Sequence, residues 1–508
     1  MSTTRVIEFP SDRSGRGGSE SDEGAGSFRL HLEFGRLPEG IESERDRRRL
    51  LLILNHPDYP GLERQIYDVG ACVDPIRISV ATLRAMSAPG QVADVVARRD
   101  LPFGVILVRC MNRRASRCPS CAQIYQGDTY QLVRAGIVGG KGVPVSVTAN
   151  PQVFATLTAP SFGAVHKATD PDSPDQVCKR RTPALCPHGR ERGCLVGHGP
   201  DDPLVGSALC PECYDYPRHV VWNANASRLC KGLMDNLYHH LARHAGVSRS
   251  EIRKSLRVEY ARVAEYQVRG AVHFHILFRL DGADGPGSPA PAWVSPEVLI
   301  EALASARRVT TVKVPSEFGG EWVLRFGGQP ERIGEPVLLD GEGYTARKVA
   351  SYLAKYVSKG TEDAHGSDVP VRRLLDIEDA GKTAHVRSLM RAAWRLGGFE
   401  EFSGMGLRRW CHMLGYGGHV LTASRGYSVT RTALRAARAE FRAGQTPGAV
   451  AGAAEEIERS LFAFAGRGYG SQALEELAED VREDIEINRQ AARDALDDQR
   501  ADARRWIA

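Results

Sequence analysis

The sequence contains no long hydrophobic run. None of its apolar stretches approaches the roughly 20 residues that a membrane-spanning helix needs. Its first ten residues, Met-Ser-Thr-Thr-Arg-Val-Ile-Glu-Phe-Pro, also lack the apolar core of a secretory signal. A strong excess of one charge is missing too, because the net charge is only +5 over 508 residues. We therefore expect a cytoplasmic protein without a membrane partner, whose mildly basic charge permits nucleic acid as a partner but does not require it.

The length predicts several domains, about two to four, with sizeable cores. Residues 1–26 are polar and rich in Gly and Ser, so we expect them to be disordered. We divide the rest of the chain into an N-terminal region (27–150), a core (151–365) with an insertion at 165–216, a basic region (366–445) and a charged helical tail (446–508).

Most of the 11 cysteines cluster between Cys72 and Cys230. In a cytosolic chain, such clusters indicate metal ligands before disulfides. Cys118-Pro-Ser-Cys121 and Cys210-Pro-Glu-Cys213 are Cys-x-x-Cys knuckles, and each knuckle normally supplies half of a tetrahedral zinc site. The two knuckles can pair with each other, or each can find its own upstream partners.

We favour two local structural zinc sites, because shorter loops cost less to close and four further cysteines are then explained. The predicted ligands of the first site are Cys72, Cys110, Cys118 and Cys121. The predicted ligands of the second site are Cys186, Cys194, Cys210 and Cys213. The residues that could substitute in the second site are Cys178, His188 and His198. We expect these sites to hold a loop-rich region together and to take no part in catalysis.

A β-hairpin is predicted over residues 255–278, with its turn at Val268-Arg269-Gly270. His273 and His275 are two residues apart on the second strand, so both point to one face. A three-residue loop with Gly270 in the left-handed conformation places Glu265 opposite His273 on that face. A two-residue turn would place it on the other face. Two imidazoles and a carboxylate that converge form an open site for a divalent ion, with His273, His275 and Glu265 as ligands.

The stretch 348–359 lacks Gly and Pro and is predicted to be a helix. Tyr352 and Tyr356, with Lys355 and Lys359, occupy neighbouring positions on one face of this helix. Two hydroxyl nucleophiles on a cationic face suit attack on a phosphodiester, although such repeats also occur without a function. Residues 153–158 are predicted to form a strand, in which Thr156 is interpreted as an ordinary strand residue.

Three segments in this order carry a resemblance to a known family: Phe154-Ala-Thr-Leu-Thr158, His273-Phe-His275 and Tyr352-Leu-Ala-Lys-Tyr-Val-Ser-Lys359. They resemble the motifs of rolling-circle replication initiators of the His-hydrophobe-His (HUH) endonuclease superfamily, in its two-tyrosine branch. The cysteine knuckles and the segment 406–418 look like the RepSA-type plasmid initiators of actinomycetes, over roughly residues 70 to 440. The resemblance implies an α+β fold: an antiparallel sheet with helices on one face, zinc-bearing insertions and a mainly helical C-terminal region.

The resemblance also implies a mechanism. Mg²⁺ or Mn²⁺ held by the two histidines and the glutamate would polarise the scissile phosphate, and a tyrosine would attack it to leave a 5′-phosphotyrosine bond and a free 3′-hydroxyl. Tyr356 is expected to attack first and Tyr352 to perform the second cleavage. Lys355 and Lys359 would lower the phenol pKa or neutralise charge on the phosphate. The implied substrate is origin DNA, single-stranded or extruded at the nick site, and a host helicase and polymerase are candidate partners.

The segment 404–442 is rich in arginine, with Trp410, Tyr416 and Tyr427 interleaved. We predict a DNA-backbone surface with stacking on the aromatic rings, and the residues named as DNA contacts are Arg408, Arg409 and Arg425. A solvated helix face would show the same composition. The tail from 472 to 506 is predicted to be a helix of mixed charge that contacts a second copy or another replication protein. The oligomeric state stays open.

Two other functions fit part of this pattern. A relaxase or transposase of the same superfamily would share the chemistry, but relaxases commonly place the tyrosine before the histidines, and single-tyrosine transposases are usually much smaller. A zinc-containing DNA-binding regulator without nuclease activity would need only the cysteine knuckles. We predict a site-specific single-strand DNA endonuclease and strand transferase that initiates rolling-circle plasmid replication.

Overall fold

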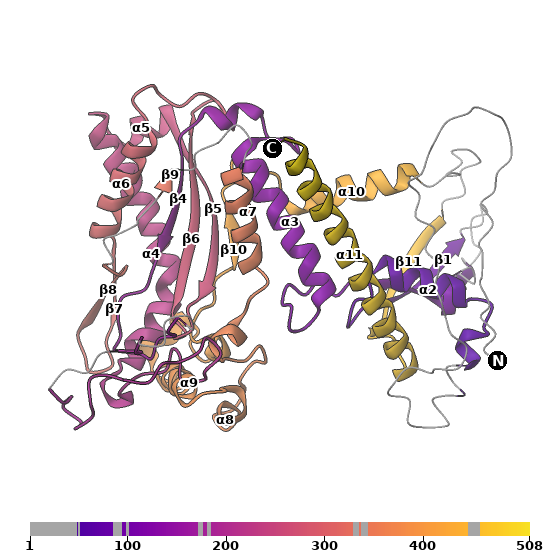
Figure 1. Cartoon of the computed structure of the whole chain (residues 1–508), viewed down its shortest axis with the longest axis horizontal. Coiled ribbons are helices and arrows are strands. Elements are labelled where there is room, and N and C mark those ends of the chain that lie inside the picture. The colour runs from indigo at the N-terminus through magenta and orange to yellow at the C-terminus, as the bar shows by residue number, and fades with distance from the viewer. Residues whose placement is uncertain are drawn as a thin grey trace. The chain divides into compact units, whose positions relative to one another are not determined.

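The computed structural model divides the chain into two compact units (Figure 1). The residues that it describes are 48, 51–84, 94–97, 101–170, 176–179, 184–328, 335–336, 344–445 and 458–507. The first unit comprises 1–110, 118–120 and 452–508, and the second comprises 111–117 and 121–451. The segment 1–26, predicted to be disordered, lies outside the described residues. No helix among the described residues is both long and apolar enough to cross a membrane.

A five-stranded antiparallel sheet forms the centre of the second unit, with the strand order β10-β5-β6-β4-β9. Its two long strands, β5 (Leu256–Tyr266) and β6 (Val272–Gly282), pair along their whole length. On the far side of β6 lies β4 (Gln152–Leu157), and the edge strands are β9 (Glu335–Pro336) and β10 (Leu421–Ala423). The predicted combination of helices with an antiparallel sheet is confirmed.

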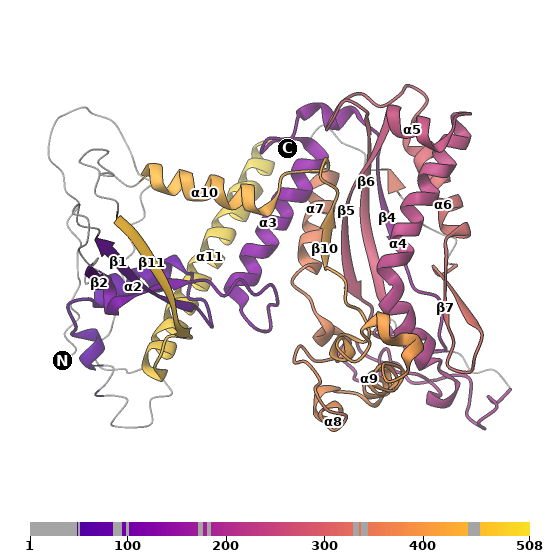
Figure 2. The ribbon, with the colours of Figure 1, turned by 180° about the vertical axis from the view of Figure 1, so that it is seen from behind.

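Helices cover both faces of this sheet, so the expectation that they lie on one face is wrong. One face packs against α4 (Tyr216–His244), α6 (Pro296–Val309) and α9 (Ala384–Leu396). The other face packs against α3 (Pro119–Val138), α7 (Tyr344–Tyr356) and α10 (Arg431–Gln445). Figures 1 and 2 show α7 and α4 on opposite sides of β5 and β6. Both faces need a cover because every position of β6 except His273 is buried.

The remaining elements of the second unit are short. They are α5 (Arg249–Ser255), α8 (Asp376–Ala380) and a hairpin of β7 (Thr311–Pro315) and β8 (Glu321–Arg325). The region between β4 and α4, which carries many of the cysteines, contains isolated bridges and a 3-10 turn instead of long elements. A hydrophobic core alone therefore does not explain how this region is held.

The first unit is built around β1 (Ile76–Arg84), which pairs with three other strands. These strands are β2 (Asp94–Ala97), β3 (Val105–Val108) and β11 (Glu458–Arg467). Its longer described helices are α2 (Tyr59–Asp68) and α11 (Gln472–Ile507). The predicted C-terminal helix is thus confirmed, but the tail also contributes a strand that the sequence did not predict.

A buried ion pair fastens β6 to the layer of helices that contains α7. Arg279 and Asp281 are 0 % and 1 % exposed, and their side chains meet at 2.7 Å (Nη2 to Oδ2) and 2.8 Å (Nε to Oδ1). The guanidinium also donates to the carbonyl oxygens of Gly136 in α3 and of Tyr427. Removing one charge would leave the other buried without its counter-charge, which is much costlier than losing a surface pair.

We expect Asp281→Asn to lower the free energy of unfolding by about 3–5 kcal/mol. The matched control is Asp235→Asn, which removes a pair with Arg249 of similar length (2.8 Å) but with 43 % of the aspartate side chain exposed. This control should change stability by at most about 1 kcal/mol. Urea unfolding followed by circular dichroism measures both, and equal effects would contradict the structural role of the buried pair.

Candidate active site and metal-binding clusters

The turn between β5 and β6 fixes which side chains face each other. Gly270 has a φ of +84°, and its N–H donates to the carbonyl of Gln267. A Cβ at Gly270 would also lie 2.7 Å from the side chain of Leu414, so only glycine fits. The resulting register pairs Glu265 with His273, which confirms the predicted hairpin.

Glu265, His273 and His275 converge on one point of the sheet. The Oε2 atom of Glu265 lies 2.9 Å from Nε2 of His273 and 3.0 Å from Nε2 of His275. The three side chains are between 3 % and 15 % exposed, and their ligand atoms all lie within 4.8 Å of one another. This group of two imidazoles and one carboxylate is of the kind that can hold a divalent cation.

Thr156 on β4 orients one of these imidazoles. Its Oγ1 atom lies 3.1 Å from Nδ1 of His275, which leaves Nε2 directed at Glu265. Phe154, on the same face of β4, stacks on the His275 ring with centroids 5.9 Å apart. Thr156 was predicted to be an ordinary strand residue. Its role depends on the pairing of β4 with β6, which places it opposite His275 and is not visible in the local sequence.

The protonation states of the group suit a cation. Burial by itself would raise the pKa of Glu265, but hydrogen bonds from His273 and His275 outweigh it and lower this pKa to about 2. Burial also lowers the pKa of His275, against the opposing effect of Glu265. An ionised carboxylate and a neutral imidazole are the ligand forms that metal binding requires.

Helix α7 presents its two tyrosines to this group. The opposite face of α7 is buried in the core through Ala346, Ala350 and Leu353, and Val357 continues this buried stripe just after the helix ends. The hydroxyl of Tyr352 lies 3.4 Å from Nε2 of His275. The ring of Tyr356 stacks on His275 with centroids 5.5 Å apart, and the two tyrosine rings lie 4.6 Å apart. Burial and the neighbouring phenol raise the pKa of Tyr352, so its free hydroxyl is neutral at pH 7.

The two lysines lie beside Tyr356. The helix ends at Tyr356, three residues earlier than predicted, and Lys359 follows in a turn. The Nζ atom of Lys359 lies 5.1 Å from the centre of the Tyr356 ring and 3.9 Å from Oε1 of Glu265. That of Lys355 lies 6.0 Å from the same ring. The phenol of Tyr356 is therefore placed among positive charges.

The cysteine-rich region of the second unit contains two clusters of four side chains that could hold a metal such as zinc. One consists of Cys186, His188, Cys210 and Cys213, with Nδ1 of His188 3.2 Å from Sγ of Cys213. The other consists of His166, Cys178, Cys194 and His198, with Nδ1 of His166 3.1 Å from Nε2 of His198. Asp202 accepts a 2.7 Å hydrogen bond from Nδ1 of His198, as the outer partners of metal-bound histidines often do.

This grouping differs from the predicted one at Cys194. Backbone hydrogen bonds between Lys179 and Cys194 form a bridge that places Cys194 beside Cys178 and away from Cys210. His188 takes the fourth position beside the second knuckle instead. The short spacing of Cys186 and His188 was the signal in the sequence that these two residues could act together as a ligand pair.

In the first unit, Cys72, Cys110 and Cys118 gather in the same way. The Cys110 N–H donates to Sγ of Cys72 at 3.2 Å, and the sulfur atoms of Cys72 and Cys118 are 3.8 Å apart. Cys121, the second cysteine of the knuckle, follows one helical turn later in α3. Three of the four residues predicted as the first zinc site are thus neighbours within one unit.

The predicted DNA surface is smaller than its composition implied. Arg408, Arg409 and Arg425 are exposed, and Arg409 lies over the ring of Trp410. Tyr416 and Tyr427 are 2 % and 0 % exposed, so the expectation that they could stack on bases is wrong. Apolar contacts with the sheet cores account for their burial.

The arginines of α10 are partly neutralised within the protein. Arg435 and Arg438 both pair with Asp128 of α3, whose side chain is 2 % exposed. Arg431 covers the ring of Tyr125. The basic composition of this helix therefore serves in part to attach it to α3.

Comparisons with known proteins agree with one another. A family described as replication initiator protein, pSAM2 (RepSA) matches residues 58–483. A curated replication initiator protein of Streptomyces ambofaciens is 38% identical over 459 residues, which cover 89% of this chain and 95% of that protein. No solved structure matches the chain.

We expect Thr156→Val to weaken the binding of Mn²⁺ at Glu265, His273 and His275 by about 10–100-fold, because His275 would lose the partner that orients it. Isothermal titration of the purified protein measures this affinity. Thr311→Val, at an exposed position of β7, is the control and should leave it unchanged. An unaltered affinity in Thr156→Val would show that the hydrogen bond does not organise the group.

Proposed function

Because the chain belongs to the RepSA family of replication initiators, we propose that it starts rolling-circle replication by cutting and rejoining one strand of origin DNA. The cut would proceed through a 5′-phosphotyrosine bond, in a core of the HUH endonuclease type. One observation carries this proposal: the rings of both tyrosines of α7 lie against the ring of His275, and His275 itself contacts Glu265. A single phosphate can touch the tyrosines and the cation ligands at the same time.

The residues that would hold the catalytic Mg²⁺ or Mn²⁺ are Glu265, His273 and His275. When bound, such an ion supplies Lewis-acid polarisation of the scissile phosphate. The protein's own contribution is to orient His275 through Thr156 and to keep the carboxylate ionised. Attack by a tyrosine requires loss of its phenolic proton. Because burial raises the pKa of Tyr352, this loss needs positive charge nearby.

We assign the first attack to Tyr356. Its oxygen forms a bond to phosphorus while the bond from phosphorus to the 3′-oxygen breaks, and the phenolic proton is lost as the 3′-hydroxyl gains one. The ammonium groups of Lys355 and Lys359, which flank this ring, stabilise the charge that develops on the phosphate. Tyr352 would then make the second cut that ends a round of replication. The released 3′-hydroxyl is the primer for a host polymerase.

The initiator role implies binding of origin DNA, and we propose that Arg408, Arg409 and Arg425 contact its backbone. All three are exposed on one short stretch of the second unit. The strand must be single or extruded at the cut, because in-line attack needs access to the phosphate. We propose the cytoplasm, where a plasmid is copied, as the site of action, with a host helicase as a further partner.

Zinc is our assignment for the Cys/His clusters. Thiolate and imidazole ligands in a four-residue set, with no position left open, are typical of structural zinc sites. Their location supports this role, because they occur in a region with few long elements. A zinc-containing regulator without nuclease activity would share these clusters, but it would not need two tyrosines beside the histidines.

The double variant Tyr352→Phe/Tyr356→Phe should bind origin DNA and leave it uncut. We expect its nicking rate on supercoiled plasmid with Mn²⁺ to fall by at least about 1,000-fold. The control Tyr130→Phe, a partly buried tyrosine elsewhere in the second unit, should nick normally. Mass spectrometry of the adduct with a single-stranded origin oligonucleotide should identify Tyr356. Continued nicking by the double variant would exclude this mechanism, and DNA binding without any nicking by the wild type would favour the regulator.

Cys194→Ser should remove about one zinc ion per chain, because it deletes one of four ligands of the cluster with His166, Cys178 and His198. Inductively coupled plasma mass spectrometry of the purified protein measures the zinc content. Cys230→Ser, at a buried cysteine of α4 outside the clusters, is the control and should retain all zinc. Equal zinc content in the two variants would show that the cluster holds no zinc.

A further inference from the structure

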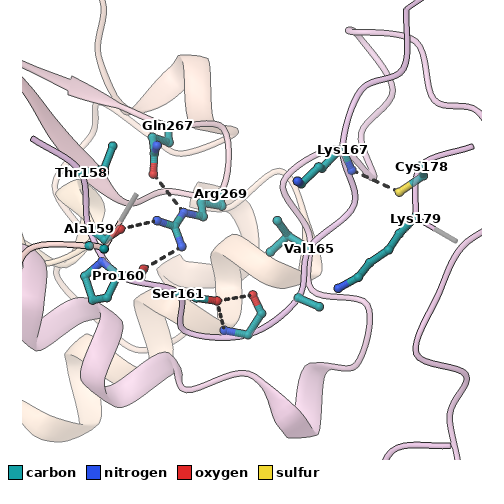
Figure 3. A pocket seen from close by; sticks show the side chains of 14 residues that line it. Thr158, Ala159, Pro160, Ser161, Val165, Lys167, Cys178, Lys179, Gln267 and Arg269 are labelled. Atoms are coloured by element: carbon teal, nitrogen blue, oxygen red, sulfur yellow. Dashed lines mark hydrogen bonds between the residues drawn. The ribbon is translucent and has the colours of Figure 1, made fainter. Parts of the chain in front are cut away.

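A pocket of ≈ 610 Å³ opens where β4 ends and where the loop between β5 and β6 turns. Three of its described lining residues are cations, namely Lys167, Lys179 and Arg269, and none is an aspartate or glutamate. Figure 3 shows the two lysines on one side of the pocket and Arg269 on the other, where its guanidinium is hydrogen-bonded to Ala159, Pro160 and Gln267. We propose that this pocket binds a phosphate of the single DNA strand next to the scissile one. The proposal rests on the proposed function for the identity of that strand.

Arg269 supplies the first part of the argument. Its guanidinium donates to the carbonyl oxygens of Ala159 (3.1 Å) and Pro160 (3.0 Å) and to Oε1 of Gln267 (3.0 Å). All three acceptors are uncharged, so no described carboxylate neutralises the guanidinium. The guanidinium also has a side-chain hydrogen bond with Tyr214, so at most one of its five N–H groups remains for a ligand. Burial lowers the pKa of Arg269, which shows that its charge is held at a cost that an anion would offset.

The lysines supply the second part, because the cluster of His166, Cys178, Cys194 and His198 sets their positions. Lys167 directly follows one cluster residue in the chain, and Lys179 directly follows another. The Lys167 N–H donates to Sγ of Cys178 (3.2 Å), and the Lys179 N–H donates to the carbonyl of Cys194 (2.9 Å). The side chains of both lysines are exposed at the pocket wall. A metal in this cluster would thus fix the backbone from which both lysines extend at one side of the pocket.

The position of the pocket supplies the third part. Thr158 lines it and lies two residues beyond Thr156, the residue that orients His275. Two residues of strand span roughly 7 Å. Gln267 and Arg269 belong to the loop that connects Glu265 to His273. The pocket therefore lies within reach of a strand whose scissile phosphate is at the histidines.

The test compares Lys167→Gln/Lys179→Gln with the control Lys231→Gln/Lys254→Gln, which changes two exposed lysines of α4 and α5. Both pairs are introduced into full-length Tyr352→Phe/Tyr356→Phe protein, so that binding is read without cleavage. The affinity for a labelled single-stranded origin oligonucleotide is measured at several salt concentrations. Each phosphate contact contributes about 0.7 to the slope of log K against log salt, so loss of the one contact in the pocket should reduce the slope by about 0.7 and weaken binding about fourfold near 0.15 M salt. The control should keep its slope, and equal zinc content and melting temperature show that the variants are folded.

Inorganic pyrophosphate, titrated by calorimetry, distinguishes a free phosphate from the DNA backbone. A flattened slope in the pocket variant alone supports the DNA strand as the ligand. An unchanged slope with lost pyrophosphate binding would overturn that assignment in favour of a free phosphate, and no change in either would overturn the pocket altogether. Nicking by the parent chain with intact tyrosines is measured in parallel. If the slope is flattened but the parent chain does not nick, only the tyrosine chemistry is contradicted. If the parent chain nicks normally but the slope is unchanged, only the pocket is contradicted.

Discussion

The pairing of β5 with β6 in a single register is the constraint on which the second unit depends. Side chains alternate across a strand, so a slip of one residue would carry Glu265 to the face opposite His273 and His275. The register is held at both ends. Gly270 permits the tight turn at one end, and the buried pair of Arg279 and Asp281 ties β6 to the helices near the other. The same pairing thus positions the candidate cation ligands and the face of the sheet against which α7 packs.

Two different means of stabilisation meet at the candidate site. The sheet and its two helical layers form extended apolar cores, and the buried stripe of α7 turns its tyrosines toward His275. The region between β4 and α4 has few long elements, and its Cys/His clusters gather side chains from distant points of the chain. One cluster residue, Cys178, also lines the pocket beside the sheet. Metal binding there would therefore bear on the shape of a surface as well as on folding.

Local patterns in the sequence predicted the elements, and long-range pairing decided what the sequence missed. The hairpin was predictable because its alternating strands and the turn at Gly270 lie within about 25 consecutive residues. The tyrosine helix was predictable because the spacing of its residues is also local. Thr156 was missed because only the alignment of β4 on β6 reveals it, and Cys194 was grouped wrongly because a backbone bridge to Lys179 moves it. The second helical layer was missed although β6 is apolar at almost every position, a pattern that calls for cover on both faces. The burial of Tyr416 and Tyr427 likewise depends on tertiary packing.

The pairing of β1 with β11 has a consequence for how the protein is made. Ser79 and Ala463, which face each other across these strands, are 384 positions apart. A ribosome working at about 5–20 residues per second needs roughly 20 to 80 s to cover that distance. During this time one edge of β1 has unpaired backbone N–H and C=O groups, which can pair with a strand of another chain. The five-stranded sheet of the second unit, whose strands are all translated before residue 424, can assemble earlier. Synthesis thus ends by closing the part of the chain that was begun first.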